Sequence, residues 1–99
     1  MMERKRPTLR ARAWRVMRMM VWWGIDDLLF TVADGTEKEA RKNLRRYVHM
    51  LAVAGYIEPH PRFSRRWRLI KNTGLEAPAY NTKTKKLTDS NTGEVFDVL

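Results

Sequence analysis

Apolar residues recur with a helical period over the first quarter of the chain. From Leu9 onward they return every three or four residues, and Pro7 and Thr8 just before them are typical of a helix start. The spacing predicts a first helix that ends near Trp23 and Gly24, because glycine readily adopts the left-handed conformation that stops a helix.

A short second helix is predicted next. Asp26 and Asp27 suit a helix N-terminus because their negative charges complement the helix dipole, and a short apolar stretch follows them as far as Ala33. The length of this stretch predicts a helix of about two turns.

The third helix is predicted to be longer and to have two distinct faces. After a turn at Asp34 and Gly35, Thr36 and Glu39 fit a capping box, which predicts a helix over 36–54. Its apolar residues fall within an arc of about 100° on a helical wheel. They are Ala40, Leu44, Tyr47, Val48 and Leu51. A separate arc holds Lys38, Arg41, Lys42, Arg45 and His49. This helix should therefore bury one side and expose a basic one.

A β-hairpin is predicted after Gly55, which should end the third helix. Two stretches of β-type residues, 56–57 and 67–71, can pair as its strands, with 59–66 as the tip. The tip carries three arginines, Arg62, Arg65 and Arg66. The hairpin therefore adds a second concentration of positive charge to the basic helix.

Residues 72–99 give weaker signals. Pro78 interrupts regular structure, and a second hairpin is predicted between 86–88 and 94–98, around a turn-rich segment. We expect this part to be a C-terminal extension of the fold.

Charge changes the picture because it is unevenly distributed. The chain has 20 basic and 11 acidic residues, a net charge of +9 and a pI near 10.5. Residues 1–71 hold 17 of the basic and 7 of the acidic side chains, whereas 72–99 hold 3 and 4. Such a basic region favours a polyanionic partner.

Several classes of protein are excluded by what the sequence lacks. It has no cysteine, so it has no disulfides, thiolate zinc sites or cysteine nucleophile. There is no phosphate-binding glycine loop, nucleophile motif or histidine pair at ligand spacing, so we expect no enzymatic activity, no cofactor and no metal. Residues 89–94 faintly resemble a calcium loop, but without the glutamate at the twelfth position a turn is the better interpretation. The apolar run 19–23 is too short to cross a membrane, so we expect a cytoplasmic protein without a membrane partner.

The order of the elements suits duplex DNA. In a helix-turn-helix, the second helix of the pair enters the major groove while the preceding helix crosses the backbone. A hairpin tip rich in arginine can lie on the neighbouring phosphates or enter a minor groove. We therefore expect double-stranded DNA as the partner, with Arg41 or Arg45 on base edges because the arginine fork fits the guanine acceptors. The candidate contacts are Thr36, Lys38, Arg41, Lys42, Arg45, Arg62, Arg65 and Arg66.

With these features, residues 8–71 resemble the winged helix-turn-helix family. The resemblance implies a mainly α, three-helix domain with a small β-hairpin as its wing, followed by the C-terminal extension 72–99 and preceded by a flexible basic arm over 1–7. Residues 68–74, followed by Ala77 and Pro78, are also similar to small regulators of Mu-like prophages. This similarity implies transcription regulation. Because family members commonly pair through their first helix or their tail, it also leaves a homodimer open.

Two other functions remain open at this stage. The same basic surface could bind RNA, with Phe63 and Trp67 stacking on bases. The fold could also serve as a protein adaptor with Trp22 and Trp23 as anchors, because two such large side chains are difficult to bury in a domain this small.

Overall fold

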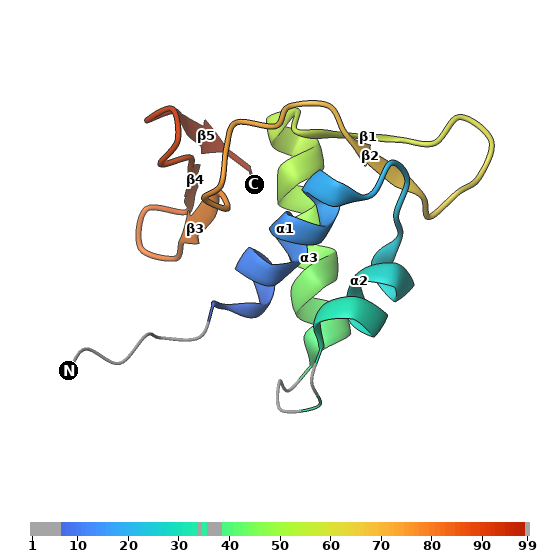
Figure 1. Cartoon of the computed structure of the whole chain (residues 1–99). Helices are drawn as coiled ribbons and strands as arrows, with labels where there is room; N and C mark the ends of the chain where they lie inside the picture. The colour runs from blue at the N-terminus through green and yellow to red at the C-terminus, as the bar shows by residue number, and fades with distance from the viewer. Residues whose placement is uncertain (1–6, 34, 36–38, 99) are drawn as a thin grey trace.

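The computed structural model describes residues 7–33, 35 and 39–98, and within them the chain forms three helices and short antiparallel strands (Figure 1). The helices are α1 (Leu9–Met19), α2 (Ile25–Val32) and α3 (Ala40–Ala54). The strands are β1 (Ile57–Pro59), β2 (Trp67–Leu69), β3 (Ala79–Asn81), β4 (Lys86–Thr88) and β5 (Val95–Asp97). The predicted combination of three helices with a small antiparallel sheet is confirmed.

The first helix ends earlier than its periodicity predicts. It stops at Met19, because Met20 is extended and Trp23 pairs with Trp67 in an antiparallel bridge. The Trp23 N–H donates to the Trp67 carbonyl at 3.0 Å, and the Trp67 N–H donates to the Trp23 carbonyl at 2.7 Å. The segment before α2 therefore extends the β1–β2 hairpin rather than the helix.

The start of α3 also differs from the prediction. The helix begins at Ala40 rather than at residue 36, and Glu39 has a left-handed backbone with φ of 54° and makes no side-chain capping bond. The predicted capping box, in which Glu39 would lie inside the helix, is therefore wrong. Thr36 and Lys38, like the arm over 1–6, lie outside the described residues. The end of α3 is confirmed at Gly55, whose φ of 86° is unstrained only for glycine.

The strands form two small sheets. β1 and β2 pair with Ile57 opposite Leu69, and the hairpin predicted from the sequence is confirmed. The second sheet has the order β3–β4–β5, so the predicted C-terminal hairpin gains a third strand. This strand was missed because it begins directly after Pro78, which locally argues against regular structure. Figure 1 shows the two sheets on opposite sides of α3.

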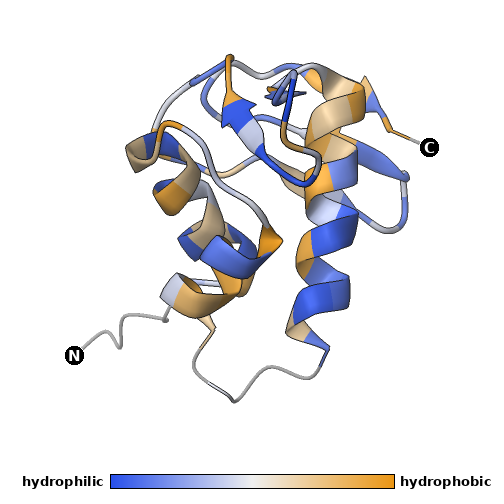
Figure 2. Ribbon diagram, turned by 90° about the vertical axis from the view of Figure 1, so that its right-hand side faces the viewer, coloured by the Kyte–Doolittle hydropathy of each residue, from blue (hydrophilic) through white to orange (hydrophobic). Residues whose placement is uncertain are grey.

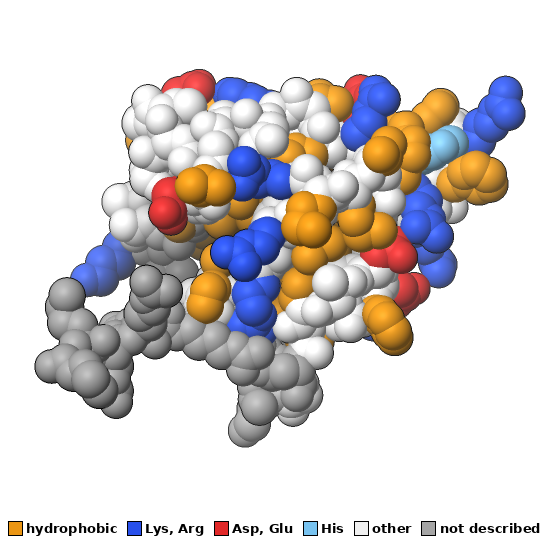
Figure 3. Space-filling view, in the orientation of Figure 1, with side chains coloured by type: hydrophobic (Ala, Val, Ile, Leu, Met, Phe, Trp, Pro, Cys, Tyr) orange, Lys and Arg blue, Asp and Glu red, His pale blue; other side chains and the backbone are white. Residues whose placement is uncertain are grey.

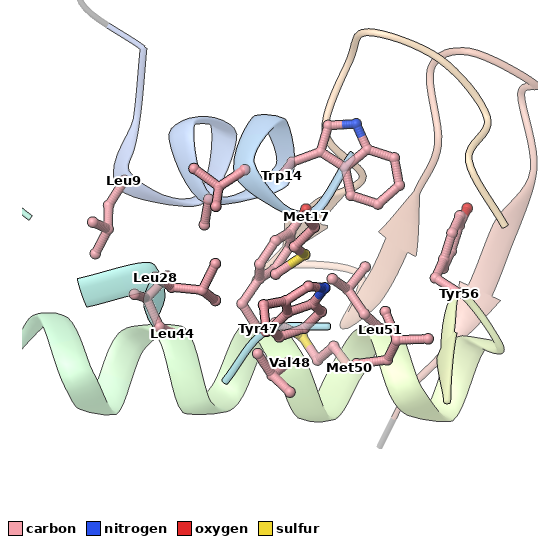
Figure 4. Close-up of a cluster of buried hydrophobic side chains, with 14 of the residues drawn as sticks. Leu9, Trp14, Met17, Leu28, Leu44, Tyr47, Val48, Met50, Leu51 and Tyr56 are labelled. Carbon is pink, nitrogen blue, oxygen red and sulfur yellow. The ribbon is translucent and has the colours of Figure 1, made fainter. Parts of the chain in front are cut away.

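The hydrophobic core lies between α3 and the two other helices. Figure 4 shows Met17 of α1 close to Tyr47 of α3, whereas the Trp14 ring points away from Leu44, toward the side of Tyr56. The Trp14 and Tyr56 ring centroids lie 5.9 Å apart. Of the apolar arc predicted for α3, Ala40 is partly buried and the other four residues are buried, with Leu44, Tyr47 and Leu51 fully inaccessible. Figure 2 shows the hydrophilic colour concentrated on the N-terminal half of α3. The sequence pattern therefore predicted correctly which side of this helix faces inward.

Residues 72–98 pack onto this core. Leu87 and Val98 are buried members of the same cluster. The Trp14 indole N–H donates to the Gly74 carbonyl at 3.0 Å, and the Tyr47 hydroxyl donates to the Pro78 carbonyl at 2.8 Å. Buried polar groups of the helices are thus satisfied by the backbone of the C-terminal segment.

A buried carboxylate connects the C-terminal segment to the rest of the fold. Asp89 is fully inaccessible, and its Oδ2 accepts hydrogen bonds from the Tyr56 hydroxyl at 2.7 Å and the Thr73 hydroxyl at 2.6 Å. Its Oδ1 accepts from the Asn91 N–H at 2.8 Å. Burial alone would raise the pKa of Asp89, but the hydrogen bonds from Thr73, Tyr56 and Asn91 outweigh it and hold the pKa below its usual value. Residues 89–94 form a turn, as predicted.

None of the helices in the described residues combines the length and the apolar character that a membrane span requires.

Candidate nucleic-acid interface

A cleft of about 610 Å³ separates α3 from the outer part of the β1–β2 hairpin. We call it the hairpin cleft. Its walls come from the start of α2, from the exposed side of α3 and from residues 64–67. The charged residues that line it are Asp26, Asp27, Arg41, Arg45, Arg65 and Arg66, with His49 beside them. Two segments about 20 residues apart in the chain thus bring their cations to one hollow.

Arg41 and Arg45 project from consecutive turns of α3 and both line the hairpin cleft. Arg41 Nη2 lies 2.7 Å from Asp26 Oδ1, and both side chains are largely exposed, at 51% and 84%. Arg45 is exposed and makes no ion pair with any other described residue. Of the two arginines predicted to contact bases, Arg41 is therefore paired with an aspartate, whereas Arg45 is available to bind a ligand.

The hairpin contributes Arg65 and Arg66 to the same cleft. Arg66 Nη1 lies 2.7 Å from Asp27 Oδ2, which also accepts from the Gly24 N–H at 2.7 Å at the start of α2. The Asp27 carboxylate therefore stabilises the N-terminus of α2 and positions Arg66 beside it.

The other predicted contacts lie apart from this group. Lys42 is exposed on α3 and Arg62 is exposed at the hairpin tip, but neither lines the hairpin cleft. Thr36 and Lys38 fall outside the described residues. The structure thus brings together four of the predicted cations, Arg41, Arg45, Arg65 and Arg66.

Sequence reasoning missed the acidic side of this cleft. The sequence places Asp26 and Asp27 at the start of a helix, which is correct for both because they lie in the first turn of α2, but it reveals neither ion pair. No local signal could reveal them, because Asp26 meets Arg41 only through the packing of α2 against α3. The pairs are solvent-exposed, so each contributes little, on the order of 0–1 kcal/mol, and can exchange for another anion.

The tip of the hairpin is organised by His60. The Nδ1 atom of His60 accepts hydrogen bonds from the backbone N–H groups of Arg62 at 3.0 Å and Phe63 at 3.1 Å. The His60 ring also contacts Trp22, with centroids 4.4 Å apart, and Phe63, at 4.8 Å. Figure 3 shows hydrophobic, histidine and basic side chains gathered at this end of the hairpin. His60, predicted only to be a surface residue, thus fixes the tip and presents Phe63, which is 64% exposed.

The two neighbouring tryptophans have different surroundings. Trp23 is completely buried whereas Trp22 remains partly exposed, which agrees with the expectation that the two could not easily both be buried. The Trp23 side chain belongs to the hydrophobic core, and its backbone pairs with that of Trp67 in the hairpin. Trp22 is half-buried, with the Arg68 guanidinium 4.8 Å from its ring centroid. An adaptor that used both tryptophans as anchors is not compatible with this arrangement.

Gly24 controls how closely the hairpin approaches α2. A Cβ atom added here would lie 2.6 Å from the Arg65 carbonyl oxygen, a contact that the backbone must move to relieve. We expect Gly24→Ala to destabilise the fold by about 1–3 kcal/mol and to displace the hairpin. Urea denaturation and backbone amide NMR shifts of residues 64–67 would measure both effects. Ser64→Ala, an exposed change in the same segment, is the control, and equal effects of the two variants would contradict the close contact.

No group of three or more metal-ligating side chains is found among the described residues. Comparisons of the chain with protein-family models, with curated proteins and with solved structures find no match.

Proposed function

We propose that this protein binds double-stranded DNA as a winged helix-turn-helix domain, with α3 in the major groove and the β1–β2 hairpin as the wing. One observation carries the proposal. Cations from α3 and from the hairpin line a single cleft, with Arg41 and Arg45 on one side and Arg65 and Arg66 on the other. Four arginines face two aspartates there, so the cleft keeps an excess of positive charge for a polyanion.

The two sides of the hairpin cleft have different tasks in this proposal. α3 exposes its N-terminal turns, from which Arg41 and Arg45 reach base edges, while Lys42 supplies charge to a phosphate. Arg62, Arg65 and Arg66 of the wing contact the neighbouring backbone or a minor groove. Asp26 and Asp27 hold the arginines in place until phosphate or base acceptors replace them, at small cost because the pairs are exposed.

The use of such binding is transcription regulation in the cytoplasm, in line with the similarity of residues 68–74 to regulators of Mu-like prophages. Selection of bound duplexes from a random pool tests this use, because a regulator enriches a defined site. An inverted repeat in that site would indicate that the protein binds as a homodimer. Recovery of unrelated sequences would reduce the activity to non-specific binding.

The salt dependence of binding gives a quantitative prediction. If about six phosphates are neutralised, the logarithm of the association constant should fall with the logarithm of salt concentration with a slope near −5. Fluorescence anisotropy of a labelled duplex at several salt concentrations measures this slope. Absence of binding at low ionic strength would contradict the proposal.

Binding of single-stranded RNA is a second candidate, favoured by the exposed Phe63 ring at the tip. Base stacking on an aromatic side chain contributes about 1–3 kcal/mol. If the tip binds unpaired bases, Phe63→Ala should weaken RNA binding by roughly 10-fold or more and leave duplex DNA binding nearly unchanged. Anisotropy titrations with a single-stranded RNA and a duplex of equal charge compare the two. A wild-type preference for the duplex, with no effect of Phe63→Ala on either ligand, would exclude this candidate.

A further inference from the structure

A second cleft, of about 760 Å³, lies where α1 and α3 meet the C-terminal segment. We call it the C-terminal cleft. It is lined by Arg10 of α1, by Arg45, Arg46, His49 and Met50 of α3, and by Tyr80, Thr82 and Val98. The β3–β5 sheet and the β1–β2 hairpin lie on opposite sides of α3 (Figure 1). The C-terminal cleft shares Arg45 and His49 with the hairpin cleft, and its other lining residues are different.

All charged side chains that line the C-terminal cleft in the described part of the chain are arginines. Arg45 and Arg46 are exposed, and neither makes an ion pair with another described residue. No described carboxylate lines the cleft to balance them. Three positive charges therefore surround a hollow without a counter-charge from the residues that line it.

Arg10 is the most informative of the three. It is half-buried, and its Nε donates to Asn43 Oδ1 at 2.6 Å, while its Cζ lies 5.4 Å from the centre of the Tyr47 ring. Both partners are uncharged. Burial lowers the pKa of the Arg10 guanidinium, and the nearby charge of Arg46 acts in the same direction. A guanidinium that is partly desolvated and orientated by neutral groups is stabilised when an anion binds beside it.

The same cleft offers apolar surface. Tyr80, Met50 and Val98 line it, and because Met50 and Val98 are nearly inaccessible, at 7% and 1% exposure, the half-buried Tyr80 ring presents the most surface of the three. Cavities of roughly 300–1,000 Å³ that combine apolar walls with a few polar groups are typical of small-molecule sites. The chemistry of the walls therefore fits a ligand with an acidic group and an apolar body.

We propose that the C-terminal cleft binds a small organic anion, with its acidic group on Arg10 and Arg46 and its apolar body against the Tyr80 ring. Arg45 and His49 line both clefts, so an anion bound here engages part of the surface that α3 offers to DNA. The ligand then acts as an effector that weakens DNA binding. The effector role rests on the proposed function, whereas the anion site itself does not.

The probe for the site is 2-naphthoate, an aromatic carboxylate, added to the full-length protein without DNA. We expect binding with a dissociation constant of about 1 mM or lower, seen as amide NMR shifts at residues 46–50, 80 and 98. The uncharged 2-naphthamide should bind about 10-fold more weakly or worse, because it offers the arginines no negative charge. Inorganic phosphate is the control for the anionic group alone, because it lacks an apolar body. It should bind more weakly than 2-naphthoate.

Arg46→Gln provides the matched test, because Arg46 is exposed and its removal leaves the Arg10–Asn43 bond in place. It should weaken 2-naphthoate binding about 10-fold, whereas Arg15→Gln, an exposed change on α1 outside both clefts, should have no effect. The proposal is overturned if 2-naphthoate does not bind, if 2-naphthamide binds equally well, if phosphate binds as tightly as 2-naphthoate, or if Arg46→Gln has no effect.

A separate titration with duplex DNA distinguishes this site from the proposed function. Binding of 2-naphthoate without any DNA binding supports the anion site and removes the DNA proposal. DNA binding without 2-naphthoate binding removes only the anion site. If both bind but saturating 2-naphthoate leaves DNA affinity unchanged, the effector role through Arg45 is overturned.

Discussion

Reversing two charges on α3, Arg41→Glu together with Arg45→Glu, is expected to weaken duplex DNA binding by at least about 100-fold. Both side chains line the hairpin cleft, and each good arginine contact with a base contributes about 1–3 kcal/mol of discrimination. The reversed charges also repel the phosphates. Anisotropy titrations against a selected site measure the loss, and circular dichroism with thermal unfolding shows whether the variant remains folded.

The control for this variant must change net charge by the same amount elsewhere. Arg15→Glu with Lys83→Glu does so, because both side chains are exposed and neither lines the hairpin cleft. It should weaken binding only several-fold, through the long-range field. Asp26→Asn provides a complementary change, since it frees Arg41 from its ion pair and should leave DNA affinity equal or higher. Equal losses from the α3 variant and from the control would mean that the charge of the whole protein, and not α3, determines binding.

The sequence predicted elements whose formation depends on nearby residues. The apolar arc of α3 is visible as a spacing of three and four residues, and burial of Leu44 and Leu51 follows from it. The stop at Gly55 is equally local, because only glycine accepts that backbone conformation without strain. Both hairpins were predictable for the same reason, since turn-forming residues separate short β-type stretches.

The errors arose where distant segments meet. The periodicity of the first helix continues past Met19, but Trp23 instead pairs with Trp67, which lies 44 residues later. β3 forms after Pro78 because Leu87 and its neighbours on β4 provide a pairing edge, and the Pro78 carbonyl accepts the buried Tyr47 hydroxyl. Such contacts between distant segments override the local propensity, and the spacing of residues in the sequence does not reveal them.

In the candidate site, too, local features were predictable from the sequence and contacts between distant segments were not. Arginines on a helix and on a hairpin tip are visible in the sequence, but their convergence on one cleft with Asp26 and Asp27 depends on packing. The C-terminal cleft had no sequence signal at all. Arg10 was one of many basic residues until the fold placed it beside Asn43 and Tyr47.

The buried carboxylate carries the largest expected effect on stability. Asp89→Ala would leave the hydroxyls of Tyr56 and Thr73 without their acceptor, and each unsatisfied buried group costs about 1–3 kcal/mol. We therefore expect a loss of about 2–4 kcal/mol in the free energy of unfolding at pH 7. Urea denaturation would measure it. Asp97→Asn, which removes an exposed carboxylate paired with Lys86, should change stability by less than about 1 kcal/mol.

The pH dependence of Asp89→Asn tests the same network with a side chain of similar size. Because the fold depresses the pKa of Asp89, ionisation of this group stabilises the protein above its unfolded pKa, near 3.9, and the contribution is lost as pH falls through the folded pKa. The stability difference between wild type and Asp89→Asn should therefore be largest at neutral pH and shrink below about pH 4. A difference that does not change with pH would contradict the charged network.

Since Asp89 joins the C-terminal segment to Tyr56 at the end of α3, both variants should lower the midpoint of a single unfolding transition. A separate early transition confined to residues 72–98 would instead show that this segment unfolds independently of the helices.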